Sequence, residues 1–193
     1  RLSLELLDSD NELTCDMVRD IEDMNAILDQ FLAFIRDGSD EPMEECDLNE
    51  LISAVVTPYS QQGHDIRVCL ESMPTLLLRR VSIKRMLANL LENALRYGGQ
   101  GVEVAASVVQ GEHAPHVAIS VLDRGAGLDP KDLPRIFNPF IRGDEARGGQ
   151  GTGLGLAIVQ RIAKQHGGSV ELHNRAGGGL EATVCLPITA HAI

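Results

Sequence analysis

Three short stretches decide the fold and the site of this chain: NLLENALRY at residues 89–97, DRGAG at 123–127 and GTGLGLA at 151–157. In the first, Asn89 and Asn93 are four residues apart, so on a helix both amides project from one face. In the second, Asp123 follows an apolar run, where a strand ends and a glycine loop begins. In the third, alternating glycines lead into an apolar helix, whose N-terminal amides can hold phosphate oxygens. Together the stretches predict a site for an anionic ligand.

The rest of the chain alternates helical and strand patterns. Helices are predicted at residues 47–59, 82–97, 131–136 and 154–166, and strands at 66–70, 102–109, 116–122, 169–173 and 180–186. Asp47 and Glu50 form a capping-box-like start for the first of these helices. The residues that this helix is predicted to bury are Leu48, Leu51, Ile52 and Val55. Helices interleaved with hairpin-like strands indicate an α/β fold, in which one face of a sheet is covered.

The first 50 residues form a different kind of region. They hold sixteen acidic and three basic residues, a net charge of -13, whereas the rest of the chain has a net charge of +2. A helix is predicted from the capping box of Ser9 and Glu12 to Asp37, with Gly38 as its stop. Its apolar residues recur at spacings of three and four, as in a heptad seam. These residues are Met17, Ile21, Met24, Leu28, Phe31 and Ile35.

Residues 1–7 look like the last turns of a preceding helix, because the pattern starts in its middle without a cap. The seam is predicted to pack against that helix, forming a partial helical hairpin. Two short helices bury little alone, so two hairpins are expected to pair into a four-helix bundle, which makes the protein a homodimer. The polar residues 38–45, which include Pro42, are predicted to be a linker between the hairpin and the α/β region. The predicted domains are therefore 1–41 and 42–193.

Composition excludes several other classes of protein. No run approaches the roughly 20 apolar residues of a membrane-spanning helix, and the N-terminus lacks a signal-peptide pattern, so no membrane contact is expected of this chain. The acidic first region and an aromatic content of 3% argue against nucleic acid as a partner. The four cysteines are scattered, which indicates reduced thiols in a cytosolic compartment. They are Cys15, Cys46, Cys69 and Cys185.

In order and content, the three opening stretches resemble the N, G1 and G2 boxes of the histidine-kinase ATP-binding domain. That domain belongs to a fold family that includes gyrase, Hsp90 and MutL. Between the last two stretches, Phe137-Asn138-Pro139-Phe140 looks like the F box of the same domain. The resemblance implies a two-layer α/β sandwich of the Bergerat type, with ATP and Mg²⁺ as ligands. The glycine pattern alone is weak, and it is not a dinucleotide fingerprint because it follows a polar loop rather than a first strand.

The resemblance also implies roles for individual residues. Asn93 becomes the magnesium ligand, which suits the preference of Mg²⁺ for hard oxygen atoms. Asp123 accepts a hydrogen bond from the adenine amino group, which selects adenine over guanine. Gly125 and Gly127 let the backbone approach the base. The whole predicted ATP-binding set is Asn89, Asn93, Arg96, Tyr97, Asp123, Gly125, Gly127, Phe140, Arg142, Gly151, Thr152, Gly153, Leu154 and Gly155.

Several of these residues have simpler interpretations. The asparagines can belong to a solvated helix face, and Asp123 can be an ordinary turn residue before glycine. Tyr97 packs either on the adenine or ribose edge or in the core, with its hydroxyl at the surface. Residues 142–150 are interpreted as a mobile lid in which Arg142 and Arg147 reach the β- or γ-phosphate, with simple solvation as the alternative. Phe137 and Phe140 are predicted to anchor this lid by packing against the sheet or the hairpin.

The class of reaction depends on position 89. The gyrase and Hsp90 relatives carry a glutamate four residues before the magnesium asparagine, and an amide such as that of Asn89 cannot replace it as general base. Glu92 is adjacent to Asn93 in sequence, but on a helix it points about 100° away. Phosphoryl transfer to a protein nucleophile is therefore favoured, and in this family that nucleophile is a histidine. No sequence like His-Asp/Glu-Leu-Arg-x-Pro-Leu is present, and His64-Asp65-Ile66-Arg67 is a decoy that enters a strand.

By this resemblance, which is particularly close to the osmosensor kinases in the linker and F-box regions, the chain is the catalytic region of a bacterial two-component sensor histidine kinase. The parent would be an inner-membrane protein whose cytoplasmic portion phosphorylates an OmpR-like response regulator. The helix segment with the acceptor histidine is expected to be missing, so we expect binding of ATP and magnesium without autophosphorylation. The alternatives are a nucleotide-gated interaction module, or pseudokinase, and a GHKL-type ATPase. A serine-directed kinase is less favoured.

Overall fold

The computed structural model describes residue 21 and the ranges 41–99, 101–111, 114–141 and 152–188. The chain divides into two units, Arg1–Asp37 and Gly38–Ile193, and the sheets and their helices belong to the second. The predicted hairpin lies outside the described residues except for Ile21, which has helical backbone and is 55% exposed. The boundary between the predicted domains and the proposed dimer therefore stay predictions.

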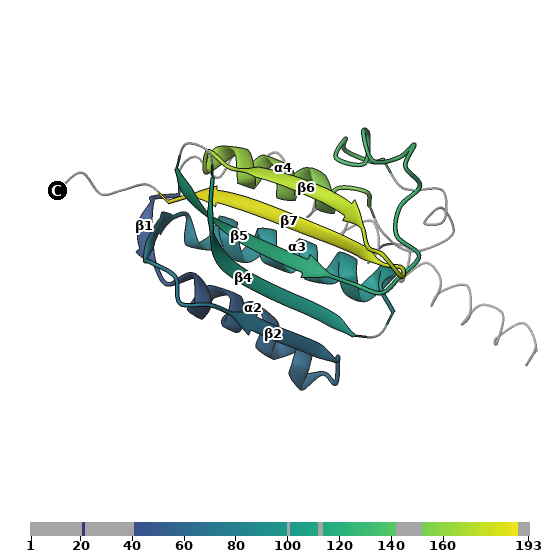
Figure 1. Ribbon diagram of the computed structural model, residues 1–193, viewed down its shortest axis with the longest axis horizontal. Helices are drawn as coiled ribbons and strands as arrows, with labels where there is room; N and C mark the ends of the chain where they lie inside the picture. The colour runs from purple at the N-terminus through teal and green to yellow at the C-terminus, as the bar shows by residue number, and fades with distance from the viewer. Residues whose placement is uncertain (1–20, 22–40, 100, 112–113, 142–151, 189–193) are drawn as a thin grey trace, which may run out of the picture. The chain divides into compact units, whose positions relative to one another are not determined.

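A five-stranded mixed sheet forms one layer of the second unit, in the order β2-β4-β5-β7-β6 (Figure 1). Its strands are β2 (Ile66–Leu70), β4 (Val102–Gln110), β5 (Pro115–Leu122), β6 (Ser169–Asn174) and β7 (Leu180–Pro187). Strands β2 and β4 pair in parallel, and every other neighbouring pair in this sheet is antiparallel. A parallel pair needs a crossover connection. Helix α3 (Arg80–Tyr97) lies in that connection.

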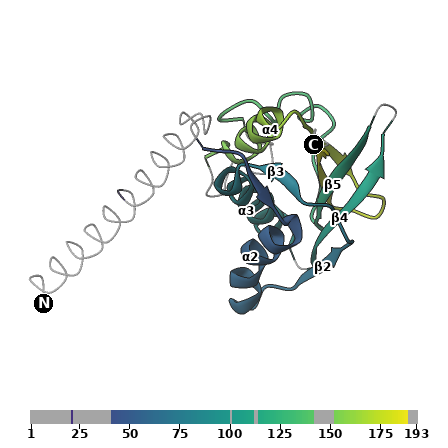
Figure 2. The same ribbon diagram turned by 90° about the vertical axis from the view of Figure 1, so that its left-hand side faces the viewer.

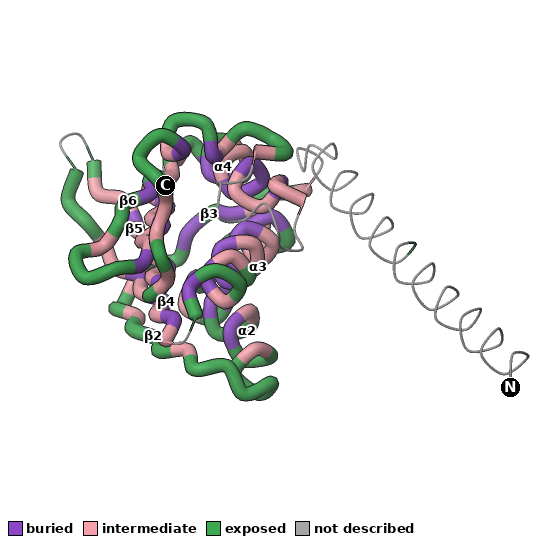
Figure 3. Tube along the Cα trace, turned by 90° about the vertical axis from the view of Figure 1, so that its right-hand side faces the viewer, coloured by how far each residue is buried: buried purple, intermediate pink, exposed green. Residues whose placement is uncertain are grey.

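Three helices form the second layer and cover one face of the sheet: α2 (Leu48–Gln61), α3 and α4 (Gly155–Gln165) (Figure 2). Alternate residues of the strands are buried, and Figure 3 shows purple segments of buried residues in both the strands and the helices. In the three central strands they are Val102, Val104, Ala106, Val117, Ile119, Val121, Ala182, Val184 and Leu186. The predicted two-layer α/β fold with one covered face is confirmed.

Helix α3 is the middle helix of this layer, packed against the sheet and against α2 and α4, and its sequence explains why. Its buried apolar residues form one stripe with helical spacing: Ile83, Met86, Leu87, Leu90, Leu91 and Ala94. Asn89 and Asn93 fall beside this apolar stripe and are half-buried. The stripe therefore fixes the helix while leaving the two amides at its margin, beside α4.

The start of α2 follows the predicted cap, with one difference. The Asp47 carboxylate accepts hydrogen bonds from the amides of Asn49 and Glu50, at 2.8 and 3.2 Å. The Glu50 side chain forms an ion pair with Arg80 at 2.8 Å, in the first turn of α3. The cap is thus one-sided, and the acidic partner expected to complete it links α2 to α3 instead.

Two smaller expectations about the helices are wrong. Val55 is half-buried, and Val56 is the residue that α2 buries there. Helix α3 begins at Arg80 rather than Ser82. Both differences are shifts of one or two residues, the scale at which helix faces and ends are hardest to place from sequence.

The short helix predicted at residues 131–136 is also wrong. This segment forms successive turns, closed by hydrogen bonds from the amides of Arg135 and Ile136 to the carbonyl of Asp132, at 3.0 and 2.9 Å. Pro130 and Pro134 have no amide hydrogen to donate, so a helical hydrogen-bond series cannot continue through them.

A two-stranded sheet was not predicted at all. Strand β1 (Glu44–Cys46) pairs antiparallel with β3 (Leu76–Leu78), with Glu45 opposite Leu77. Residues 44 and 45 were expected in the linker, because strands of three residues give almost no periodic signal. The pair closes the end of the fold at which α3 begins, and Cys46 is buried there.

No helix in the described ranges is long and apolar enough to cross a membrane. Within the same ranges, Cys46, Cys69 and Cys185 form no disulfide, in agreement with the prediction of free thiols. The fourth cysteine, Cys15, lies outside them.

Candidate functional site

The start of α4 lies directly against the two asparagines of α3. A Cβ atom added to Gly155 would lie 3.2 Å from Oδ1 of Asn89 and 3.3 Å from Nδ2 of Asn93. Gly155 is the first residue of α4, where backbone N–H groups have no partner within the helix. The structure thus brings the asparagine stretch and the last glycine of the 151–155 stretch together. Because Gly155 has no side chain, there is space between the two asparagine amides and the N-terminus of α4.

The two asparagine side chains differ in which of their polar atoms already have hydrogen-bond partners. Nδ2 of Asn89 donates to the carbonyl of Arg85 at 2.8 Å, one turn earlier, so its Oδ1 is the group turned towards Gly155. The amide of Asn93 makes no hydrogen bond to any residue that the structure describes. Since Oδ1 of Asn49 is the one buried polar side-chain atom without a hydrogen bond in the described ranges, the Asn93 amide is open to solvent and is available to a ligand.

Asp123 is held in place by one of its two carboxylate oxygens. The residue is only 6% exposed, and its Oδ1 accepts hydrogen bonds from the amides of Gly125 and Leu180, at 2.9 and 3.0 Å. Within the described ranges Oδ2 has no hydrogen bond. An ionised carboxylate only accepts, so Oδ2 is suited to a ligand group that donates, such as an exocyclic amino group.

Gly98 connects Asp123 to the end of α3. A Cβ at Gly98 would lie 2.2 Å from the Cβ of Asp123, so only glycine permits this approach. Gly98 caps α3 through its amide, which donates to Ala94 at 2.8 Å. Asn93 lies five residues earlier, a rise of roughly 7.5 Å along the helix. The asparagines, the start of α4 and Asp123 therefore follow one another along the C-terminal half of α3.

Nothing in the sequence indicated the role of Gly98. A glycine after NALRY is typical only of a helix stop. The neighbouring Gly125, which was predicted, is equally constrained, because a Cβ there would lie 2.2 Å from the carbonyl oxygen of Tyr97. The 123–127 loop is thus packed directly on the last residues of α3.

The glycines before α4 are also tied to the F-box segment. Gly153 has a φ of 69°, and a Cβ there would lie 2.9 Å from the carbonyl oxygen of Ile141. Its own carbonyl accepts from the amide of Phe140 at 3.0 Å. Leu154 is fully buried, and its amide donates to Oγ1 of Thr152 at 3.4 Å. These contacts hold the chain that enters α4.

The aromatic residues near this segment are partly exposed. Phe140 is 56% exposed with a φ of 66°, and Phe137 is half-buried. Their predicted role as anchors of the lid involves residues outside the described ranges and stays a prediction. Tyr97 is 46% exposed, which is inconsistent with the core alternative. Arg96 is likewise exposed. The remaining predicted residues Arg142, Arg147 and Gly151 lie outside the described ranges.

Glu92, the acid next to Asn93 in sequence, is directed elsewhere. The Tyr59 hydroxyl on α2 donates to its Oε1 at 3.0 Å. Burial, together with the charge of Glu92, raises the pKa of Tyr59 to about 12, so this donor keeps its proton at neutral pH.

The described part of the chain contains no group of three His, Cys, Asp or Glu side chains arranged to hold a metal ion. Among the described residues of this site, the candidate metal ligands are therefore amide oxygens.

The opposite end of α3 is capped by Glu41. Its carboxylate accepts hydrogen bonds from the amide of Val81, and from the amide and hydroxyl of Ser82 at 3.0 and 2.6 Å. Burial acts to raise the pKa of Glu41, but these hydrogen bonds outweigh it and lower that pKa. A carboxylate at a helix N-terminus also interacts favourably with the helix dipole.

His166, just beyond α4, completes this second cluster. It is buried, and its Nε2 accepts from the amide of Arg79 at 3.1 Å while Nδ1 donates to the carbonyl of Ile162 at 2.8 Å. Burial lowers the pKa of His166, which favours this neutral tautomer. Arg79 Nε donates to the carbonyl of Glu41 at 2.9 Å. Polar groups at this end of α3 therefore have partners within the protein.

Known proteins that resemble the chain provide an independent observation. A family model described as "Histidine kinase-, DNA gyrase B-, and HSP90-like ATPase" matches residues 79–190. Sensor histidine kinase GtrS of Pseudomonas aeruginosa is 35% identical over 188 residues, which cover 97% of this chain and 38% of GtrS. The chain thus spans well under half the length of this relative.

Two solved structures are similar in fold. Full-length ShkA in complex with AMPPNP matches with a TM-score of 0.74 and 28% identity, over 92% of this chain and 38% of that one. The histidine kinase domain of the E. coli osmosensor EnvZ, solved by NMR, matches with a TM-score of 0.61 and 36% identity, over 81% of this chain and 95% of that one. GtrS and the EnvZ domain are both named as histidine kinases, and the family model covers both α3 and α4.

Proposed function

The chain belongs to the histidine kinase-, DNA gyrase B- and HSP90-like ATPase family, and we propose that its site holds ATP with magnesium for transfer of the γ-phosphoryl group to a histidine. The observation that carries this proposal is the contact of Gly155 with the amides of Asn89 and Asn93. It places a helix N-terminus beside two amide side chains, on the helix whose end contacts Asp123.

Each part of this arrangement suits one part of the nucleotide. Oδ2 of Asp123 accepts a hydrogen bond from the adenine amino group, while Oδ1 keeps its two backbone donors. The amides at the start of α4 hold phosphate oxygens. Thr152, Gly153 and Leu154 shape the chain there, and the exposed Tyr97 and Phe140 border the site together with Arg96. Arg142 and Gly151 complete the proposed set.

The residues present fit magnesium. The amide of Asn93 has no partner within the described part of the chain, and the absent side chain of Gly155 leaves space beside it. Magnesium uses few protein ligands beside substrate phosphates and waters, so one amide oxygen is sufficient. When bound, it neutralises charge on the β- and γ-phosphates. Asn89 Oδ1, turned to the same space, can accept a hydrogen bond from a water and orient it, but an amide oxygen cannot remove a proton.

The lack of a general base at position 89 distinguishes kinase from ATPase. Asn89 occupies the position at which water-activating relatives have glutamate, and Glu92 is bound to Tyr59 on α2. Slow hydrolysis follows, because water is a poor nucleophile without a base. An imidazole nitrogen needs no such activation at neutral pH. Transfer to a histidine is therefore favoured over a GHKL-type ATPase.

We further propose the setting in which this transfer takes place. No stretch of the sequence resembles the acceptor motif, so the histidine is supplied by sequence outside these 193 residues, and the chain alone does not autophosphorylate. The chain is the cytoplasmic portion of a bacterial inner-membrane sensor that dimerises through its hairpin and passes the phosphoryl group to an OmpR-like response regulator. The heptad seam, and the 35% identity to a sensor histidine kinase over 38% of its length, support this setting.

A two-step experiment tests the proposal. Calorimetric titration with a nonhydrolysable ATP analogue, with and without magnesium, should show binding that magnesium strengthens. The chain is then mixed with a separately produced helical hairpin carrying an acceptor histidine and with γ-labelled ATP. Acid-labile label on that hairpin, absent when its histidine is replaced by glutamine, is the expected result. Binding without labelling would favour the interaction module, and rapid phosphate release would favour the ATPase.

A further inference from the structure

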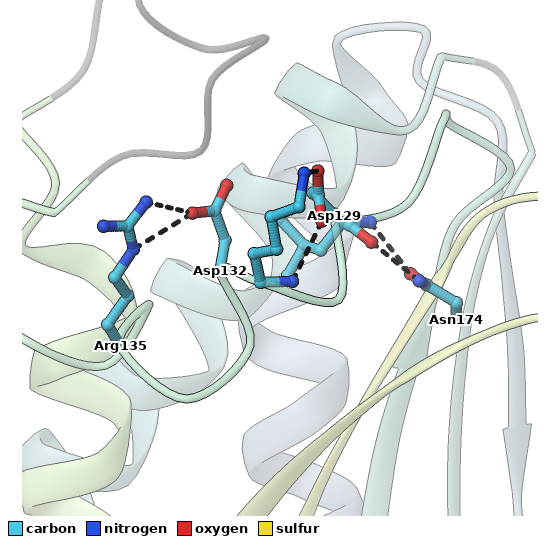
Figure 4. Close-up of polar contacts among 6 residues, drawn as sticks. Asp129, Asp132, Arg135 and Asn174 are labelled. Atoms are coloured by element: carbon cyan, nitrogen blue, oxygen red, sulfur yellow. Dashed lines mark hydrogen bonds and ion pairs between the residues drawn. The ribbon is translucent and has the colours of Figure 1, made fainter.

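The hairpin formed by β6 and β7 contacts the loop that follows Asp123. At the end of β6, the Asn174 side chain makes two hydrogen bonds to the backbone of Leu128 (Figure 4): its Oδ1 accepts from the amide at 2.8 Å, and its Nδ2 donates to the carbonyl at 2.7 Å. One amide side chain thus satisfies both backbone groups of a residue 46 positions away. The Asn174 side chain thus pairs with the Leu128 backbone as the backbone of an adjacent β-strand would, although Leu128 lies in a loop.

Gly127 makes this contact possible. Its φ is 81°, and a Cβ there would lie 2.6 Å from Oδ1 of Asn174. The glycine therefore supplies more than backbone freedom, because it leaves the space that the Asn174 amide occupies. A glycine that was predicted to let the backbone approach a base also admits a side chain from the β6–β7 hairpin.

The next residues of the hairpin hold Asp123 itself. Nη1 of Arg175 donates to the carbonyl of Asp123 at 2.6 Å, and the amide of Arg175 donates to Gly179 at 2.9 Å, which closes the turn. The amide of Leu180 donates to Oδ1 of Asp123, and the amide of Asp123 donates back to Leu180 at 2.9 Å. A Cβ at Gly179 would lie 2.1 Å from the Asp123 carbonyl oxygen. The hairpin therefore fixes both the backbone and one carboxylate oxygen of Asp123.

We infer that Asn174 and Arg175 are positioning residues for recognition of the purine, holding the Asp123 loop so that Oδ2 meets the amino group of the base. This inference rests on the proposed function, which assigns adenine to Asp123. Its physical basis is that the 123–129 segment has no regular secondary structure of its own. The loop keeps its geometry through hydrogen bonds from the hairpin, and discrimination by hydrogen bonding depends on that geometry.

The test measures affinity for two nucleotides rather than one. Asn174→Ala and Arg175→Met are titrated with a nonhydrolysable ATP analogue and with the matching analogue that lacks the 6-amino group. We expect about tenfold weaker binding of the ATP analogue, since roughly one to two hydrogen bonds are lost. Binding of the analogue without the amino group should weaken by about threefold or less, so the preference for adenine falls. A general loss of structure would weaken both equally.

Matched variants separate positioning from folding. His173→Ala removes the exposed neighbour of Asn174, whose ring contacts Glu171 at 3.2 Å, and should leave both affinities unchanged. Arg175→Lys retains a charged donor and should recover most of the loss. Asn174→Asp has the same shape but sets a carboxylate oxygen against the Leu128 carbonyl, so it should bind the ATP analogue no better than Asn174→Ala. Thermal unfolding of each variant without nucleotide should stay cooperative: His173→Ala should melt like wild type, and Asn174→Ala and Arg175→Met should melt lower by roughly 2–8 °C, as expected for one or two lost hydrogen bonds.

The possible outcomes distinguish this inference from the proposed function. If the wild-type chain binds neither nucleotide, the proposed function is wrong and the inference falls with it. If the wild type binds with a clear preference for adenine, and Asn174→Ala and Arg175→Met keep both affinity and preference, only the inference is overturned. Equal losses for the two nucleotides would also overturn it, because they would indicate a purely structural role.

Discussion

The two ends of helix α3 differ in whether their polar groups have hydrogen-bond partners within the protein. At the N-terminal end, the amides of Val81 and Ser82 are bonded to Glu41, and the amide of Arg79 is bonded to His166. Towards the C-terminal end, the amide of Asn93 and Oδ2 of Asp123 have no hydrogen bond in the ranges that the structure describes. Both ends belong to one helix with one continuous apolar stripe. The difference in hydrogen bonding between the two ends therefore comes from the polar residues around the helix and not from its apolar packing.

This contrast distinguishes residues kept for stability from residues kept for a ligand. In the described ranges, Oδ1 of Asn49 is the one buried polar side-chain atom without a hydrogen bond, so the Asn93 amide and Oδ2 of Asp123 are open to solvent and can be reached by a ligand. The satisfied end should respond to mutation through stability. The unsatisfied end should respond through nucleotide affinity. Substitutions at the two ends test that division, and the largest effect is expected at Asp123.

Asp123→Asn should have the largest effect at the unsatisfied end. The variant keeps an oxygen to accept from Gly125 and Leu180, but it sets an NH₂ group against the adenine amino group. We expect about 100-fold weaker binding of an ATP analogue, which corresponds to about 2.7 kcal/mol. Calorimetric titration measures this. Unchanged affinity would refute the role of Asp123 in binding adenine, and with it the conclusion that the C-terminal end of α3 serves a ligand.

Asn93→Ala should weaken binding only when magnesium is present. Loss of the amide oxygen should lower affinity for the magnesium complex by about tenfold, because magnesium then loses its proposed protein ligand. Affinity measured in excess chelator should change little. The control is the wild-type chain titrated under the same two conditions. An equal loss with and without magnesium would show that Asn93 contacts the nucleotide rather than the metal.

Glu41→Gln should act at the satisfied end, on stability alone. The glutamine has one oxygen, so it can accept from Val81 or from Ser82 but turns its NH₂ group towards the other, and it loses the charge that favours the helix N-terminus. We expect the free energy of unfolding to fall by about 1 kcal/mol, as for the loss of a helix cap. Chemical denaturation measures this, and nucleotide affinity should not change. A loss of affinity would mean that the two ends of α3 are coupled.

His166 should give the smallest effect, visible as a dependence on pH. Its pKa is lowered by burial, so the folded state binds fewer protons than the unfolded state near and below the ordinary pKa of about 6.5. Stability from this residue is complete above that pKa and is lost as the pH falls through it. The charged groups that face His166 are Arg79 and Glu41. The melting temperature, measured from pH 8 to about pH 5.5, should fall less steeply in His166→Gln than in wild type.

Much of the fold was predictable because its information is local. The apolar spacing of α3 and the alternation in β4, β5 and β7 each identify an element within a window of about ten residues. The two-layer architecture follows from interleaving these elements. The turns at 130–137 were wrongly predicted as a helix although Pro130 and Pro134 are visible in the sequence, so that error was avoidable.

The site was predictable in its residue types but not in its supporting contacts. The positions of Asn93, Asp123 and Gly155 carry chemical signals that are evident one motif at a time. The approach of Gly98 to Asp123, and of Asn174 to Leu128, joins residues distant in sequence whose types are ordinary for a helix stop and a strand end. The pairing of β1 with β3 was missed for the same reason. Long-range partners become visible only when the chain has folded.

The hydrogen bond from Tyr59 to Glu92 has a consequence for how long a bound nucleotide survives. Because the acid nearest to Asn93 in sequence is occupied on α2, a change at Glu92 should not turn the domain into an efficient hydrolase. Efficient ATP hydrolysis would instead require a general base, such as glutamate, at position 89. Under the proposed function, a nucleotide bound here stays intact until an acceptor histidine is presented, so the partner that carries this histidine sets the time of phosphoryl transfer.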